Sequence, residues 1–204
     1  TPGPSALFVR KDTEQYHVVL SGPGVSRSDE RRYAASLLDA IVGGSASSRL
    51  FQEIREKRGM AYSVYSYGSQ YAETGQVGIY IGTRGDNLAS CLDVTATELR
   101  DVGQGNLHPG ELERAKENLR GRLLLAQEST SSRMNRLGRA LITGVELVSL
   151  EETIARIDAV GIDDVAELAR ETLAPEALSM AGIGTSEKRF RSALHLFNPL
   201  VPEA

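Results

Sequence analysis

GGSASSRLFQEIREKRGMAYSVYS, residues 43–66, contains the clearest structural signals in the chain. Gly43 and Gly44 let the backbone turn tightly between two helices, because glycine has no side chain to obstruct the turn. A short helix with one apolar side is expected over residues 47–57. Gly59 then stands where a helix ends in the left-handed conformation. Alternation with period two follows and predicts an antiparallel hairpin over residues 61–83.

The same patterns, followed outward, predict the fold class. Strands are expected at residues 6–11, 14–22 and 177–184, and helices at 29–42 and through most of the chain after Asp86. Strands and helices do not alternate strictly, which argues against a parallel doubly wound sheet. The sequence therefore predicts an α+β fold: a two-layer sandwich of a mixed, mainly antiparallel sheet with helices packed on one face. Residues 6–204 are expected to form one domain, and residues 1–5 a linker.

Composition excludes several kinds of partner. The 204 residues carry a formal net charge of −4, so no basic surplus points to nucleic acid. No apolar run is long enough to cross a bilayer, and no membrane partner is expected. The single cysteine, Cys91, forms no internal disulfide and is expected to be a small buried residue on a helix. With no recognisable signal peptide, we expect a cytoplasmic location.

Metal and phosphate sites are not expected. The three histidines, His17, His108 and His195, lie far apart in sequence, and neither H-x-x-E-H nor H-E-x-x-H occurs. The glycine-rich start of the quoted run lacks the lysine and the spacing of a phosphate-binding loop. The sequence itself therefore predicts no metal ligands in this chain.

Three arginines recur at a spacing of three: Arg133, Arg136 and Arg139. Such a stripe is typical of a solvated helix face whose charges pair with local carboxylates. The alternative is that it holds another domain or an acidic substrate.

Arg55 and Tyr62 are the candidate binding residues. Arg55 follows Phe51 by four residues and should emerge at the rim of the apolar stripe. A helix, a stop at Gly59 and a strand could bring the guanidinium and the phenol to one edge of the sheet. In the alternative interpretation, Arg55 forms a surface ion pair and Tyr62 simply packs.

The quoted run resembles the pitrilysin/insulinase family of zinc metallopeptidases, the inverzincins, and most closely the branch of mitochondrial processing peptidase and its bacterial relatives. That family's second domain carries G-G-x-x-S-S-R-L-F-x-x-I-R-E-K-x-G-x-A-Y-S. Residues 43–63 match it at nearly every fixed position, and the resemblance extends over essentially the whole chain. The matched structural positions include Gly43, Gly44, Ser48, Arg49 and Gly59.

The resemblance implies a function. Family members have two similar α+β domains that close like a clamshell, with zinc bound in the N-terminal domain by H-x-x-E-H and a downstream glutamate. Arg55 and Tyr62 match an arginine and a tyrosine that contact the substrate backbone beside the zinc. Because the zinc motif is absent here, the chain resembles the C-terminal half of an endopeptidase acting on peptides or unfolded polypeptide. It should bind no zinc and be inactive alone, and residues 1–5 would link it to a missing N-terminal half.

A different class of function stays open. The family includes members that have lost catalysis and act as structural or partner subunits. In either case a surface made to face a sister domain should be exposed, with Tyr62, Tyr65, Tyr67 and the Gly43–Gly44 corner at its border. Homodimers of the isolated chain through that surface are therefore expected to be possible.

Overall fold

The computed structural model describes residues 3–201 and contains one five-stranded mixed sheet. The strand order is β1-β5-β2-β4-β3, with β1 parallel to β5 and the other pairs antiparallel. The strands are β1 (Ala6–Arg10), β2 (Tyr16–Gly24), β3 (Ala61–Gln70), β4 (Gly75–Thr83) and β5 (Ser179–Gly184). The expected hairpin over residues 61–83 is formed by β3 and β4.

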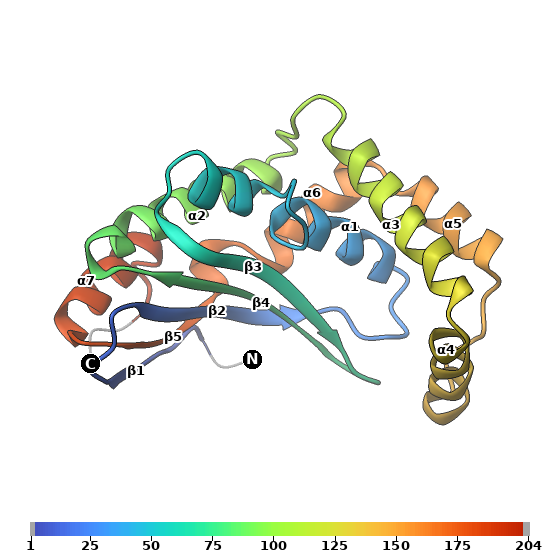
Figure 1. The fold of residues 1–204 in the computed structure, drawn as a ribbon, viewed down its shortest axis with the longest axis horizontal. Helices are drawn as coiled ribbons and strands as arrows, with labels where there is room; N and C mark the ends of the chain where they lie inside the picture. The colour runs from blue at the N-terminus through green and yellow to red at the C-terminus, as the bar shows by residue number, and fades with distance from the viewer. Residues whose placement is uncertain (1–2, 202–204) are drawn as a thin grey trace.

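The helices lie on one side of this sheet, as Figure 1 shows, so the α+β two-layer fold is confirmed. The short helices are η1 (Phe51–Glu56), η2 (Gly85–Asn87) and η3 (Pro175–Ala177). The longer ones are α1 (Arg32–Val42), α2 (Leu88–Gly103), α3 (Glu111–Glu128), α4 (Thr130–Thr143), α5 (Leu150–Ala159), α6 (Ile162–Thr172) and α7 (Glu187–Phe197). No described helix combines the length and the apolar character that spanning a membrane requires.

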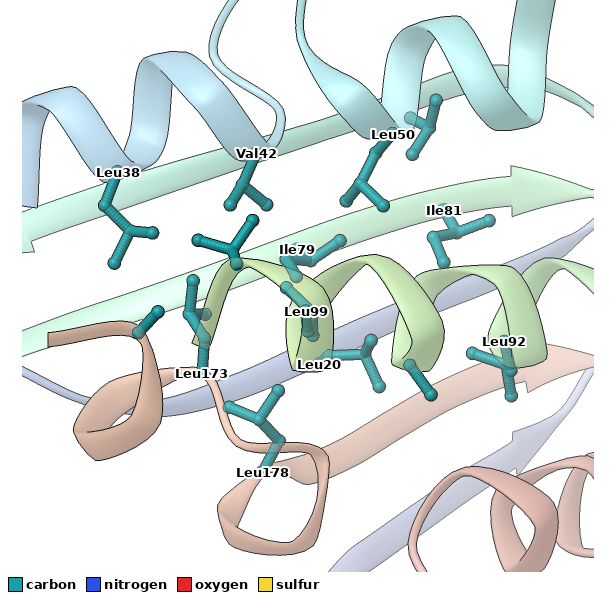
Figure 2. Packing of buried hydrophobic residues seen from close by; sticks show 14 of the residues in the cluster. Leu20, Leu38, Val42, Leu50, Ile79, Ile81, Leu92, Leu99, Leu173 and Leu178 are labelled. Carbon is teal, nitrogen blue, oxygen red and sulfur yellow. The ribbon is translucent and has the colours of Figure 1, made fainter. Parts of the chain in front are cut away.

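The core lies between the sheet and the helices. Alternate residues of the central strands point toward the helical layer, because successive strand side chains face opposite sides. Leu20 of β2 and Ile79 and Ile81 of β4 are fully buried there. Figure 2 shows these side chains meeting leucines from the helices, among them Leu38 and Leu99. Because one face of each central strand packs against the helices, only the opposite face can meet another layer.

The helices differ from the expectation in three places: two differ in their boundaries, and one was not predicted. Helix α1 begins at Arg32, not at residue 29, because Asp29 binds the backbone and side chain of Arg31 instead of capping the helix. The helix expected at 47–57 is shorter and takes a wide π-helical turn at Phe51–Glu56. Helix α7 was not predicted, although Ser186 caps it and its apolar residues recur at helical spacing.

The other face of the sheet has no helix over it among residues 3–201. Across the strands its middle row is Leu7, Ala181, Val19, Tyr80 and Tyr65. The Tyr65 and Tyr80 rings stack with centroids 5.1 Å apart, and Leu7 and Tyr65 are exposed. This uncovered face therefore exposes apolar side chains, as expected for a domain that meets another layer.

The structure describes only part of the expected linker at residues 1–5. Thr1 and Pro2 lie outside the described residues, and residues 3–5 form neither helix nor strand. The Ser5 N–H donates to Ser179 Oγ (3.1 Å), and the Ser5 carbonyl accepts from the Met180 N–H (2.9 Å). Ser5 is thus already attached to the edge of the sheet, and the domain boundary stays a prediction.

Candidate functional site

Arg55 is presented by the wide turn η1. In this turn the Lys57 N–H donates to the Gln52 carbonyl five residues earlier (2.9 Å). Ile54 is fully buried and anchors the turn, so its neighbour Arg55 points outward. The Arg55 guanidinium lies over the Phe51 ring, with Cζ 4.8 Å from the ring centroid. Isolated π-turns of this kind recur at functional sites, where they redirect a side chain.

Tyr62 is the second residue of the edge strand β3, at an irregularity in the register with β4. The Arg55 Cζ lies 5.2 Å from the Tyr62 ring centroid, within the range of a cation–π contact. Tyr62 is 74% exposed and lies outside the core. Arg55 forms a surface ion pair with Glu56, as the alternative interpretation expected, but the distance of 3.6 Å from Nε to the carboxylate is too long for a hydrogen bond.

The pair therefore keeps its hydrogen-bonding capacity. Within residues 3–201, neither the Tyr62 hydroxyl nor the Arg55 guanidinium makes a hydrogen bond. A guanidinium offers five N–H donors in a planar fork, and a phenol offers one further donor. Together they form an exposed donor pair suited to carbonyl or carboxylate oxygens. Their contact with a substrate stays a prediction.

The Gly43–Gly44 corner joins α1 to the edge strand. Both glycine N–H groups donate to the Asp39 carbonyl (3.0 and 2.7 Å), and Ser66 Oγ donates to Asp39 Oδ1 (2.5 Å). Burial raises the pKa of Asp39, and the Ser66 hydrogen bond opposes that rise. Gly43 is buried and Gly44 is half-buried. The place of this corner at the border of an exposed surface stays a prediction.

The two motif glycines should respond differently to substitution. A Cβ on Gly43 would lie 2.3 Å from the Ser66 backbone nitrogen, whereas Gly59 has open space but a left-handed φ of +59°. We expect Gly43→Ala to lower the free energy of unfolding by roughly 2–3 kcal/mol. Gly59→Ala should cost about 1 kcal/mol. Urea denaturation measures both.

Asparagine separates the two causes. Gly59→Asn should cost less than Gly59→Ala, because asparagine tolerates the left-handed conformation. Gly43→Asn should be at least as damaging as Gly43→Ala, because the obstacle there is steric. Equal costs for the two alanine variants, with no relief at Gly59→Asn, would contradict this assignment.

Arg49 is buried at the start of the helical run before η1. Its Nε and Nη2 donate to the two oxygens of Glu111 (2.9 and 2.7 Å), and Nη1 donates to Glu98 (3.3 Å). Nη2 also donates to the Asn106 carbonyl (2.6 Å). This network ties the motif to α2 and α3. Ser48 has a local role, since its Oγ donates to the Ser45 carbonyl (2.6 Å).

The two carboxylates around Arg49 respond to burial differently. Burial tends to raise the pKa of Glu111, but hydrogen bonds from Arg49 and the His108 N–H outweigh it and hold the pKa below its ordinary value. Burial raises the pKa of Glu98, and the attraction of Arg49 only partly opposes that rise. Glu111 is therefore the principal anionic partner of Arg49.

The donor groups of this chain do not fit a zinc ion. His17 lies on β2 with Nδ1 2.7 Å from the Tyr80 hydroxyl, His108 precedes α3, and His195 lies on α7. Nowhere in residues 3–201 do three or more histidine, cysteine, aspartate or glutamate side chains gather closely enough to hold a metal ion.

Two further sequence interpretations have clear outcomes. Cys91 is fully buried on α2, and burial raises the pKa of its thiol, so the structural interpretation is confirmed. The arginine stripe on α4 is exposed, as expected. The prediction that local carboxylates pair with the stripe was wrong, because none of Arg133, Arg136 and Arg139 forms a salt bridge within the described residues.

The fold and this site define a class: an α+β domain that presents exposed hydrogen-bond donors and, over the part of the chain that the structure describes, brings no cluster of metal ligands together. The family model described as the peptidase M16 inactive domain matches residues 1–119. The chain is also 42% identical over 188 residues to an uncharacterized zinc protease of Streptomyces coelicolor, covering 92% of this chain and 41% of that protein. It belongs to the peptidase M16 family, as an inactive domain of that family, and the resemblance seen in the sequence is confirmed.

Other comparisons agree. The uncharacterized zinc protease YmxG of Bacillus subtilis is 39% identical over 165 residues, covering 81% of this chain and 40% of that protein. A peptidase M16 inactive domain from Pseudomonas fluorescens has the same fold, with a TM-score of 0.82, 24% identity, and coverage of 91% of this chain and 44% of that one. A chain of Complex III2 from Candida albicans superposes with a TM-score of 0.80 at 18% identity, covering 96% and 49%. The chain thus spans about two fifths of these curated relatives.

Proposed function

We propose that this chain is the substrate-binding, non-metal half of a zinc-dependent endopeptidase acting on peptides or unfolded polypeptide. The observation that carries the proposal is the exposed Arg55–Tyr62 donor pair, with 5.2 Å between guanidinium and ring. It lies in a family domain whose relatives are named zinc proteases. The partner is an N-terminal zinc-binding half, in the same polypeptide or in a separate one.

In this proposal the two halves divide the chemistry. Zinc held by the other half would activate water and polarise the scissile carbonyl. Arg55 and Tyr62 donate hydrogen bonds to the peptide backbone from the opposite side, where they orient it and stabilise the negative charge that develops on oxygen. The stacking of Arg55 between Phe51 and Tyr62 holds its fork in place before the peptide arrives.

The direct test is made on the whole protein. The polypeptide encoded immediately before Thr1, or by the adjacent gene, should contain H-x-x-E-H and a downstream glutamate. After a chelator wash, elemental analysis should find about one zinc in the combined protein and none in this chain alone. Stoichiometric zinc in this chain alone would contradict the division of labour.

A second candidate is a non-catalytic partner subunit of the same fold. A chain of Complex III2 from Candida albicans shares the fold at 18% identity, and the resemblance seen in the sequence includes family members that have lost catalysis. A missing H-x-x-E-H in both the upstream polypeptide and the adjacent gene, together with no peptide cleavage, would favour this candidate over the peptidase.

A further inference from the structure

Helix α4 stands apart from the body of the domain. Figure 1 shows it at the end of the molecule opposite α7, beyond α3 and α5 and away from the helices that cover the sheet. None of its residues is buried. A helix with an apolar side normally depends on packing for its stability. An unpacked one is therefore a surface that another element covers.

The exposed side of α4 is apolar. Leu141 is 84% exposed and Ile142 is 87% exposed, and Met134 and Leu137 of the same helix are also exposed. Leu124 and Leu125 near the end of α3, and Leu147 after α4, are exposed as well. So many large apolar side chains in one region mark an interaction surface rather than ordinary surface variation.

Behind α4 lies an arginine-lined hollow of about 250 Å³, between this helix and the start of α1. Its arginines are Arg27, Arg32, Arg136 and Arg139, and Glu146 is its one lining carboxylate. Arg27 donates to the Gln70 carbonyl (2.9 Å) and Arg136 to the Val148 carbonyl. Within residues 3–201, only Arg32 of the four has a carboxylate partner, Glu30 at 3.2 Å.

We propose that α4 and this hollow form a docking arm for the zinc-bearing half of the same protein; the inference rests on the proposed function. The arm would bind an apolar patch of that half with acidic residues at its rim. No carboxylate occurs between Ser129 and Val145, so every charge on α4 itself is positive, and Glu146 is the one carboxylate beside it in the hollow. Acidic groups on the partner would supply the carboxylates that these arginines lack.

The lengths of the relatives favour the zinc-bearing half as the partner that binds the docking arm. The chain spans 41% of the Streptomyces coelicolor relative and 40% of YmxG, so more than half of each relative lies outside the match. A partner in the same polypeptide has a high effective concentration, so a modest surface suffices to hold it.

A second copy of this chain fits the arm less well. In a two-fold dimer each α4 would meet the other α4, because the same patch is used on both subunits. The stripe of Arg133, Arg136 and Arg139 would then face an identical stripe with no carboxylate in either helix. Like charges placed together in this way oppose association.

Hydrogen exchange of residues 130–143 tests the proposal, first in this chain alone and then with the zinc-bearing half bound, in cis or in trans. We expect the α4 amides to exchange about tenfold or more slowly in the complex. Equal exchange in both states would overturn the docking arm while leaving the proposed function standing. If no zinc-bearing half exists, both proposals fail.

Variants identify the contact. Leu141→Glu and Arg139→Glu should each weaken binding of the zinc-bearing half by roughly tenfold or more, with the melting temperature unchanged. Arg139→Lys should retain most of the binding because it keeps the charge. Leu196→Glu, at a leucine on α7 that is also exposed (65%, against 84% for Leu141), is the matched control and should bind normally.

Two other partners, a second copy of this chain and a membrane, are tested by separate measurements. Sedimentation of the chain alone and flotation with phosphatidylserine vesicles report on a second copy and on a membrane. If Leu141→Glu abolished dimerisation or vesicle binding but left binding to the zinc-bearing half unchanged, the proposal would be wrong.

Discussion

Replacing Arg49 with methionine should lower the free energy of unfolding by about 3–5 kcal/mol, because removing one partner leaves buried charges uncompensated. Arg49 is only 4% exposed and contacts both oxygens of Glu111. Methionine preserves much of the side-chain volume, so the loss reports on charge and hydrogen bonding rather than on a cavity. Urea denaturation with an unchanged m-value measures the loss.

Two control variants sharpen this result. Arg49→Lys keeps the charge but cannot reproduce the two parallel hydrogen bonds, so its cost should be intermediate. Arg100→Met removes an exposed pair with Glu176 (2.8 Å) and should cost less than about 1 kcal/mol. A cost for Arg49→Met no larger than that for Arg100→Met would show that the buried network does not hold the motif in place.

The same network predicts a pH dependence. The pKa of folded Glu111 lies below its ordinary value of 4.5, so the ionised form contributes stability above pH 4.5. That contribution is lost as the pH falls through the lower, folded pKa. The gap in unfolding free energy between the native chain and Glu111→Gln should therefore be widest near neutral pH and narrow below pH 4.5. A gap that widens toward low pH would contradict the assigned direction.

Arg55→Ala should lower kcat/KM for peptide cleavage by about 10²–10³-fold in the enzyme reassembled from both halves, as expected for loss of a transition-state hydrogen-bond donor. Tyr62→Phe should have a smaller effect, because water can replace the lost hydroxyl. Arg55→Lys should rescue only partly, since a point charge lacks the planar fork. Steady-state cleavage of a fluorogenic peptide measures all three.

Measurements of unfolding and of zinc content show whether the Arg55 and Tyr62 variants lose activity only because the domain unfolds or zinc is lost. Arg55 and Tyr62 are outside the core, so each variant should unfold within about 1 kcal/mol of the native chain and leave zinc content unchanged. Arg58→Ala, which removes an exposed partner of Glu53 on the same turn, is the matched control and should cleave normally. If Arg55→Ala unfolded the domain, or cleaved like the Arg58 variant, the donor role would be wrong.

Local patterns were enough to predict the sheet and the presence of most of its helices. Strand alternation reports directly which side chains face the core, and the hairpin of β3 and β4 formed where period two indicated. Gly43 and Gly59 were correctly identified as special positions, because tight approach and left-handed backbone both require glycine. The proximity of Arg55 and Tyr62 followed from the same local signals, since only seven residues separate them.

Long-range pairing could not be predicted in the same way. Arg49 and Glu111 are 62 residues apart, and the sequence gives no indication that they meet in the interior. Glu111 was not predicted to lie in the interior, although a carboxylate in the first turn of a helix is itself a signal. The exposed position of α4 at one end of the molecule also depends on the tertiary structure. The sequence does not reveal it, so local carboxylate partners were expected for the arginines of α4.

The most direct test of the central claim is peptide cleavage by the zinc-bearing half with and without this chain. We expect negligible cleavage by either half alone and cleavage on mixing the two with native Arg55. Cleavage should fall about 10²-fold or more when the added chain carries Arg55→Ala. Full cleavage by the zinc-bearing half alone, unaffected by adding this chain, would contradict a substrate-binding role for this domain.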